Sequence, residues 1–311
     1  MGKDKRLHTQ RFVYRWLYQR WIFEWLDSVV EILSHTFCHR IADIISGCYT
    51  RTHPRIVDTV ADNLQLLTNA PVSKKKAAKV FWEFARCIAD YTWLGKQPAA
   101  TVLQHCSDYT GIEHMTKALA NKRGAILATA HFSLFEFGSI VLQDLNLPLT
   151  ILTHTEPNEE LTQWRADYRA RWGAKTIELG DDQFQSLRVV HELAKNRLCA
   201  MLVDRPTLGG SSLIQMPGGS MYFSTSAALL AYLADCPILP VLVRRDKAGL
   251  FQLIAKPPIF VERTLDKKQA LETATQKVAT ALISEIRKTP TQWFQFIPIR
   301  ADRADRADAC R

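Results

Sequence analysis

The first hundred residues carry their apolar positions at helical spacing. In residues 11–33 the charged side chains recur every three to five positions and form one polar stripe, while the rest of the circumference is apolar and rich in tryptophan. Residues 55–67 also place their apolar side chains on one face, and Ser73 is a favourable N-cap for a helix over 74–95. We therefore expect a helical region over 1–100, which includes an amphipathic helix at about 10–34.

The pattern changes after this region, because short apolar runs begin to alternate with helical stretches. The runs that predict strands are 125–130, 149–154, 175–179, 198–204, 238–243 and 251–260, and the intervening helices are predicted at 134–145, 158–172, 184–196 and 224–235. Strands that alternate with helices indicate an α/β fold, in which helices flank a mixed central sheet. This domain is predicted over 101–300, ends with a helix at 267–289, and precedes a disordered tail at 301–311, which repeats Ala-Asp-Arg.

The sequence argues against a secretory signal at the N-terminus and against a membrane span there or at 206–234. The basic N-terminus is followed by about forty residues that charges interrupt too often for either segment. One long uncharged run, 206–234, contains two prolines and four glycines, so it is predicted as a loop followed by a buried helix.

Composition narrows the class of protein. The chain has 311 residues, a formal net charge of +9 and 47% hydrophobic residues, so it is long enough for a large core and favours acidic partners. Its seven cysteines include no Cys-x-x-Cys pair, which indicates reduced, buried thiols in a cytoplasmic compartment rather than a disulfide framework or a zinc site.

The helix at about 10–34 has two interpretations. Six Lys and Arg residues against one acid in the first twenty-two positions, beside Trp and Tyr, suit the headgroup region of an anionic membrane. The alternative is that its aromatic face packs on the domain. The three lysines at 74–76 are read as a solvated first helical turn, with contact to phosphate or to a carrier protein as the alternative.

The stretch GAILATAHFSLFEFG, residues 124–138, contains the strongest candidates for chemistry. His131 follows the predicted strand directly, at the carboxyl edge where open α/β sheets collect ligands. Five positions turn a helix by about 140°, so His131 meets Glu136 only if the histidine lies in the loop and the glutamate in the first helical turns. The carboxylate would then accept the Nδ1–H and leave Nε2 free as a base. The alternative is that His131 caps a helix and Glu136 is exposed.

HFSLFEFG resembles the active-site block of the bacterial lipid A biosynthesis acyltransferases, the lauroyl/myristoyl-type family within the lysophospholipid-acyltransferase-like superfamily. The resemblance extends through GIEHMTKALANKRGAILATAHF, RADYRARWGAK and RLCAMLVDRP to TPTQWFQFIPIR, and it covers roughly residues 50–300. The N-terminal helix stands where family members carry a membrane anchor.

The resemblance implies an O-acyltransferase with a glycerolipid acyltransferase-like fold. It would move a fatty acyl chain from an acyl carrier protein thioester, or acyl-CoA, to a hydroxyl of a phosphorylated lipid acceptor such as a lipid A precursor. It implies a peripheral or monotopic location on the cytoplasmic face of the bacterial inner membrane and no cofactor. In this family His131 would deprotonate the hydroxyl and Glu136 would orient the imidazole. No Gly-x-Ser-x-Gly elbow is present, which favours direct transfer.

Further candidates come from the other matching blocks. Arg165, Arg169 and Arg171 precede Gly173, where the family often places an arginine that meets lipid or donor phosphate; Arg169 is the first choice. The alternative is a solvated helical face. Asp204 and Arg205 end a predicted strand and are candidate substrate contacts, although many relatives have Asp-Gln there.

Two more positions have open interpretations. Ser133 is predicted either to donate a hydrogen bond in the site or to cap a helix. Gly218 and Gly219 either present backbone N–H groups to an anion or form a plain turn before a helix that begins at Ser224, and the turn is preferred. His105, His114, His154 and His191 have no ligand spacing, so we predict no metal.

Other functions remain open at this point. The acceptor would alternatively be another glycolipid or an aminolipid. The chain departs from the family pattern at 204–206, which is Asp-Arg-Pro, and at 133–135, which is Ser-Leu-Phe. These departures suggest a catalytically silent partner that binds lipid or carrier protein, although both His131 and Glu136 are present. Nucleic-acid binding is disfavoured, because outside the N-terminal helix the basic residues form no recognisable module.

Overall fold

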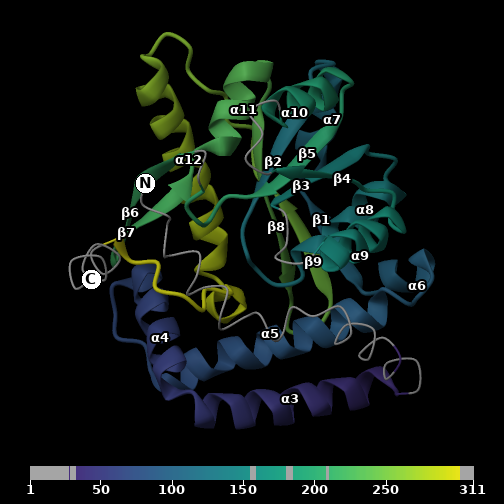
Figure 1. The fold of residues 1–311 in the computed structure, drawn as a ribbon, viewed down its shortest axis with the longest axis vertical. Helices are drawn as coiled ribbons and strands as arrows, with labels where there is room; N and C mark the ends of the chain where they lie inside the picture. Colours follow the sequence, from purple (N-terminus) through teal and green to yellow (C-terminus); the bar gives the residue numbers. More distant parts are fainter. Residues whose placement is uncertain (1–27, 29–32, 155–158, 180–184, 208–209, 302–311) are drawn as a thin grey trace.

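A computed structural model describes residues 28, 33–154, 159–179, 185–207 and 210–301 (Figure 1). Most of the predicted helix at about 10–34, and all but the first residue of the predicted tail, lie outside the described residues. The described part is a mixed α/β structure, as the sequence predicts, with a seven-stranded sheet flanked by helices (Figure 1).

The sheet has the strand order β1-β9-β8-β2-β5-β3-β4. Four neighbouring strands are parallel, β8(Ile238–Arg245), β2(Ala125–Thr129), β5(Leu198–Leu202) and β3(Leu149–His154), and β4(Lys175–Leu179) continues them at the edge. At the other side β9(Phe251–Ala255) is antiparallel to β8, and β1(Cys106–Thr110) is parallel to β9. Because β2 and β5 are central, their carboxyl ends open at the middle of one sheet edge.

The helices before the sheet are α3(His35–Thr52), α4(Pro54–Thr68), α5(Lys74–Leu94) and α6(Ala99–Leu103), and those within and after it are α7(Ile112–Ala120), α8(Gly138–Asp144), α9(Glu159–Ala170), α10(Gln185–Ala194), α11(Ser226–Ala234) and α12(Lys267–Ile286). The helices α4, α5 and α8 to α12 lie close to their predicted positions, whereas α3, α6 and α7 were not predicted as separate helices. Ser73 caps α5 as expected, because its hydroxyl accepts from the Lys76 backbone N–H. In Figure 1, α3 and α5 lie side by side at the base of the molecule.

The helix predicted over 134–145 begins differently. Residues Phe135–Phe137 form a 3-10 turn, η1, and the α-helix begins only at Gly138. A turn of 3-10 helix is tighter than an α-helical turn, so it redirects the side chains that follow His131.

The interpretation of 206–234 as loop and helix was incomplete. An antiparallel hairpin, β6(Ser211–Met216) and β7(Gly219–Ser224), precedes α11. Pro217 and Gly218 form its turn, and Gly219 is the first residue of β7. The Gly218 N–H donates to the Leu66 carbonyl at 3.0 Å, so this N–H binds the end of α4. Ser224 lies in β7, and α11 begins at Ser226.

One hydrophobic core joins the sheet to the preceding helices. It includes side chains of α4 and α5 together with those of β2, β5, β8 and α12. Burial on this scale holds α5 rigidly against the sheet. Within the described residues, no helix combines the length and apolarity that a membrane crossing requires.

Candidate active site

The site begins where two neighbouring parallel strands end. Thr129, the last residue of β2, pairs with Leu202, the last residue of β5. His131 and Asp204 each stand two residues further along, so equal extension of the two strands places them side by side. The imidazole Nδ1 lies 2.7 Å from Asp204 Oδ1, and the His131 backbone N–H donates to Asp204 Oδ2 at 3.0 Å.

Asp204 is a fully buried carboxylate whose oxygens are both occupied. Besides His131, Oδ2 accepts from Trp293 Nε1 at 2.9 Å and from Gln295 Nε2 at 2.7 Å. Burial alone would raise the pKa of Asp204, but the interactions with His131 and with the Arg205 charge, together with these hydrogen bonds, lower it to about 2. An ionised carboxylate only accepts, so Nδ1 carries the proton and Nε2 has the free lone pair.

The predicted pairing of His131 Nδ1 with Glu136 is therefore wrong. The partner is Asp204, because it lies on the adjacent strand at matching register, whereas the 3-10 turn carries Glu136 towards α5 and α9. Glu136 is not exposed either: it retains 8% of its accessible surface.

Glu136 lies in a buried polar cluster of its own. Its Oε1 accepts from an Arg169 guanidinium nitrogen at 2.7 Å, and its Oε2 accepts from the Tyr91 hydroxyl at 2.9 Å. Burial would raise the pKa of Glu136, but the charges of Arg169 and Arg165 and these hydrogen bonds bring it below the ordinary value. Glu136 is consequently an anion inside the protein.

Three arginines within and just after α9 lie at different positions relative to this anion. Arg169 is 5% exposed and pairs with Glu136, and its Nε has no hydrogen-bond partner among the residues that the structure describes. The charge of Arg165 acts on both Glu136 and His131. Arg171 lies 6.0 Å from the Tyr168 ring. Arg165 is thus the arginine whose charge acts on both His131 and Glu136. Contact between any of these arginines and a phosphate stays a prediction.

Residues near the C-terminus hold the loop that carries His131. The Phe294 N–H donates to the His131 carbonyl at 2.8 Å, and the Ser133 N–H donates to the Gln292 carbonyl at 2.8 Å. The Gln292 side chain in turn bonds both backbone groups of Arg245 on β8. This segment, 290–296, is therefore an extra support beside the strand ends.

Arg205 joins the same support. Its Nε donates to Gln295 Oε1 at 3.0 Å, and another guanidinium nitrogen donates to the Phe294 carbonyl at 3.0 Å. Arg205 thus fixes the residue that holds Asp204, and its charge also acts on His131. Substrate contact by Asp204 or Arg205 stays a prediction, and the buried position of Asp204 makes it a positioning residue.

Ser133 is not a side-chain helix cap. Leu134 is the N-cap of the 3-10 turn, and no side-chain hydrogen bond caps it. Ser133 is buried and has φ 48°, in the left-handed region that non-glycine residues rarely adopt. This conformation turns the chain sharply between His131 and Glu136, and its hydrogen bond to Gln292 helps to maintain it.

The protonation of His131 suits a base at neutral pH. Burial lowers the pKa of the imidazole, and so do the charges of Arg205 and Arg165, while the Asp204 carboxylate raises it; the net effect is a lowered pKa. The side chain retains 24% of its accessible surface. The ring is therefore neutral, oriented through Nδ1, and partly accessible.

Trp293 and Gln295 were not predicted as site residues, although TPTQWFQFIPIR was recognised as a block. They are two positions apart, so in an extended segment they project to the same side, where both bond Asp204. A Trp and a Gln separated by one residue in an otherwise apolar C-terminal stretch were the available signal.

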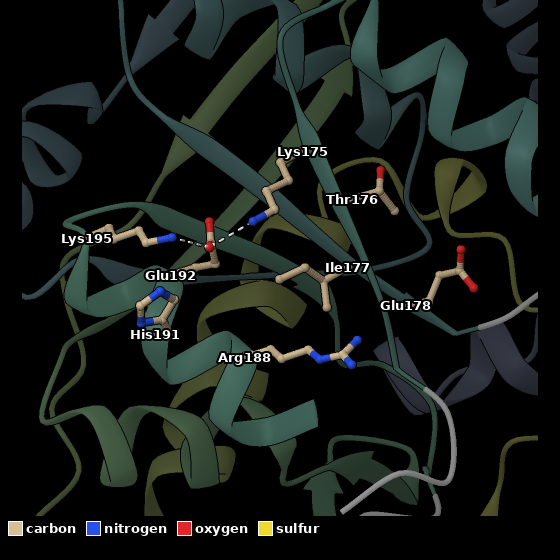
Figure 2. A pocket seen from close by; sticks show the side chains of 8 residues that line it. All are labelled: Lys175, Thr176, Ile177, Glu178, Arg188, His191, Glu192 and Lys195. Atoms are coloured by element: carbon tan, nitrogen blue, oxygen red, sulfur yellow. Dashed lines mark hydrogen bonds and ion pairs between the residues drawn. The ribbon is translucent and has the colours of Figure 1, made fainter. Parts of the chain in front are cut away.

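A hollow of about 650 Å³ lies elsewhere, between β4 and α10 (Figure 2). Seven of its eight lining residues are polar or charged, and in Figure 2 Lys175 and Lys195 both point to Glu192, at 2.8 and 3.1 Å. Lys175 begins β4, so the hollow includes the amino end of a strand parallel to β2, away from the carboxyl ends where His131 lies.

Comparison with protein families identifies the chain. The model of the bacterial lipid A biosynthesis acyltransferases matches residues 1–298. The chain belongs to this family. A comparison with curated protein sequences returned no significant match. The family assignment makes the chain an acyltransferase of the lipid A biosynthesis type and agrees with the resemblance of the HFSLFEFG block.

Proposed function

We propose that this acyltransferase moves a fatty acyl chain from a thioester, on acyl carrier protein or CoA, to a hydroxyl of a lipid A precursor or related glycolipid. The observation that carries the proposal is the pair formed by His131 and Asp204. It fixes Nδ1–H on the ring and leaves Nε2 as an accessible base at a strand end. This arrangement suits the removal of a proton from an alcohol.

In the proposed reaction Nε2 of His131 takes the proton of the lipid hydroxyl as the oxygen attacks the thioester carbon. A tetrahedral intermediate forms, with negative charge on the former carbonyl oxygen. When the intermediate collapses, the carbon–sulfur bond breaks, the ester remains on the lipid, and the imidazolium returns its proton to the leaving thiolate. Asp204 stabilises the imidazolium while it exists, since it accepts from Nδ1 and is ionised.

Glu136 has a different role in this mechanism. It anchors Arg169 and Tyr91, and its charge balances the two arginines of α9. Arg165, whose charge acts on His131 as well, is the residue that we assign to negative charge on the substrate, either on a phosphate or on the developing oxyanion. Glu136 thus supports the site through the arginines rather than through the imidazole.

Direct transfer is the simplest course for these residues. The nucleophile is the lipid hydroxyl, and the chain has no Gly-x-Ser-x-Gly elbow that would place a serine beside the base. A net charge of +9 suits both an acidic carrier protein and an anionic lipid surface. We place the enzyme accordingly at the cytoplasmic face of the bacterial inner membrane.

The experiment that tests the proposal incubates the purified full-length chain with acyl carrier protein thioester or acyl-CoA and a detergent-solubilised bacterial lipid extract. The expected result is a lipid A-type product heavier by one acyl group, with release of the free thiol. Hydroxylamine should remove the acyl group if it is an ester. A product that is an acylated aminolipid, or an amide, would contradict the proposed acceptor, and the absence of any acylated lipid would contradict the reaction.

A further inference from the structure

Two histidines of α3 and an aspartate of α5 meet away from His131. His35 and His39 are four residues apart, so they lie on one face of α3. His35 Nε2 lies 2.7 Å from Asp90 Oδ1, and His39 Nε2 lies 2.5 Å from the same oxygen. The two ring nitrogens and the carboxylate oxygen all lie within 4.8 Å of one another.

The surroundings hold these groups in place. Asp90 is 2% exposed, and the side chains of His35 and His39 retain 30% and 19% of their accessible surface. Trp93, one turn after Asp90, stacks on the His35 ring at 4.5 Å between centroids. Arg245 of β8 bonds the other carboxylate oxygen, Oδ2, so Oδ1 is the atom that faces both imidazoles. The cluster is ordered and still open on the α3 side.

We propose that His35, His39 and Asp90 bind one divalent transition-metal ion of the zinc type. Two imidazole nitrogens and one carboxylate oxygen are the ligands of many such sites, with a water molecule or substrate atom at the fourth position. Zinc needs ligand atoms at about 2.0–2.2 Å, so three atoms this close to one another require only a small outward adjustment to surround it. The ion would replace two ring N–H donors that otherwise compete for one oxygen.

The charges around the cluster permit this ion. Arg245 opposes a cation, but it is paired with Oδ2 of Asp90 and also interacts with Glu83, which lies seven residues earlier on α5. The buried thiols Cys38 and Cys87 also lie within the electrostatic reach of Asp90. In this arrangement Arg245 orients the ligating carboxylate, as hydrogen-bonding groups around metal ligands commonly do.

The ion would join α3 to α5. Asp90 is followed directly by Tyr91, whose hydroxyl bonds Glu136 of the candidate active site. A metal at Asp90 therefore stabilises the helix that supports Glu136, and it takes no part in the chemistry at His131. The inference stands on the side-chain cluster alone and holds whether or not the proposed acyl transfer is correct.

The test is a cobalt(II) titration of the tag-free full-length chain after dialysis against a chelator. We expect one Co²⁺ per chain, with the strong visible d–d absorption of a low-coordinate nitrogen and oxygen site, which Zn²⁺ then removes by displacement. His35→Ala and His39→Ala should each weaken Co²⁺ binding at least tenfold, and the double variant should lose it. His191→Ala, which removes an exposed histidine of α10, is the matched control and should bind Co²⁺ as the unaltered chain does.

Thermal unfolding supplies a second measurement that does not depend on absorbance. Zn²⁺ should raise the unfolding temperature of the unaltered chain and of His191→Ala, but not that of the double variant, because only a native site that binds the ion gains stability from it. Far-ultraviolet circular dichroism checks that the variants are folded. A chain that binds no Co²⁺ at micromolar concentrations, or a folded double variant that binds it unchanged, would overturn the proposal.

Discussion

Asp204 is the residue on which the candidate active site depends most. Both of its oxygens accept hydrogen bonds, and the donors come from the loop after β2 and from the C-terminal segment 290–296. A buried carboxylate that is paired and fully hydrogen-bonded has a fixed orientation, so it fixes the ring of His131 as well. The orientation of the His131 ring thus derives from the buried hydrogen bonds around Asp204.

Asp204→Asn tests this positioning role. The amide keeps the size of the side chain, but only its oxygen accepts hydrogen bonds, whereas both carboxylate oxygens of Asp204 accept them. The imidazole therefore loses its anionic partner and its preferred tautomer. We expect kcat for acyl transfer to fall about 10²–10⁴-fold while KM stays nearly unchanged. Steady-state kinetics measure this, with Asp144→Asn, an exposed carboxylate on α8, as the control. A large rise in KM with kcat intact would instead indicate direct substrate binding.

The pH dependence gives an independent prediction for His131. Because burial and the charges of Arg205 and Arg165 hold its pKa below 6.5, the base remains neutral through neutral pH. The acid limb of kcat/KM should therefore show an apparent pKa below 6.5, with activity lost as the pH falls through it. The Asp204 carboxylate raises the pKa of His131 in the unaltered enzyme, so its removal in Asp204→Asn should lower that pKa and move the acid limb to still lower pH. An acid limb above 6.5 would contradict this assignment.

At the scale of residues, the sequence predicted the position of His131 after a strand but assigned its Nδ1 the wrong partner. Proximity along the chain favoured Glu136, and the HFSLFEFG resemblance strengthened that choice. The pairing with Asp204 depends on strand order and register, which place β5 beside β2. Apolar periodicity identifies strands but does not say which of them are neighbours, so it could not predict that Asp204 is the partner of His131.

Among the elements, the β6–β7 hairpin is the largest departure from the predicted arrangement. Its strands lie in the uncharged run 206–234, whose prolines and glycines were read as loop signals. The helices and most central strands were predictable because long periodic segments bury one face. The hairpin was not predicted because the prolines and glycines of this run were taken as loop signals, and because its turn is held by α4, a segment far away in the sequence.

Gly218 makes the contact between the hairpin and α4 testable. A Cβ at this position would lie 2.0 Å from the Gln65 carbonyl oxygen, which belongs to the backbone and cannot move aside cheaply. Gly218→Ala should therefore lower the free energy of unfolding by about 1–3 kcal/mol, as overpacking does. Chemical denaturation measures this change.

Gly47→Ala is the matched control for that substitution. Gly47 lies inside α3, and the nearest atom to a new Cβ is the flexible end of Arg51 at 3.2 Å. Alanine should leave stability unchanged or raise it by up to about 1 kcal/mol, because it favours a helix more than glycine does. Equal effects of the two substitutions would contradict the close packing of the hairpin turn on α4.

On the scale of the whole molecule, the charge and the helical N-terminal region bear on where the enzyme works. The predicted amphipathic helix at about 10–34 is basic and aromatic, and it precedes α3, which exposes Phe37, Ile44 and Ile45. Amphipathic helices of this composition bind the surface of anionic bilayers through both apolar burial and charge. We expect this helix to provide the main attachment to lipid.

Flotation with vesicles that contain anionic lipid tests that expectation. Removal of residues 1–33 leaves α3 with its Ser34 cap and should abolish most binding, and binding of the full-length chain should weaken as salt is added. A truncated chain that floats as well as the full-length one would show that attachment depends on another surface.

The central claim is that the imidazole of residue 131 is the base for acyl transfer, and the most direct measurement is the transfer rate of His131→Ala. Thioester consumption and lipid acylation are followed together, and circular dichroism establishes that the variant is folded. The account predicts that acylation falls at least about 10²–10⁴-fold, the range that a positioned base contributes. A folded His131→Ala variant that acylates lipid at the rate of the unaltered enzyme would contradict it.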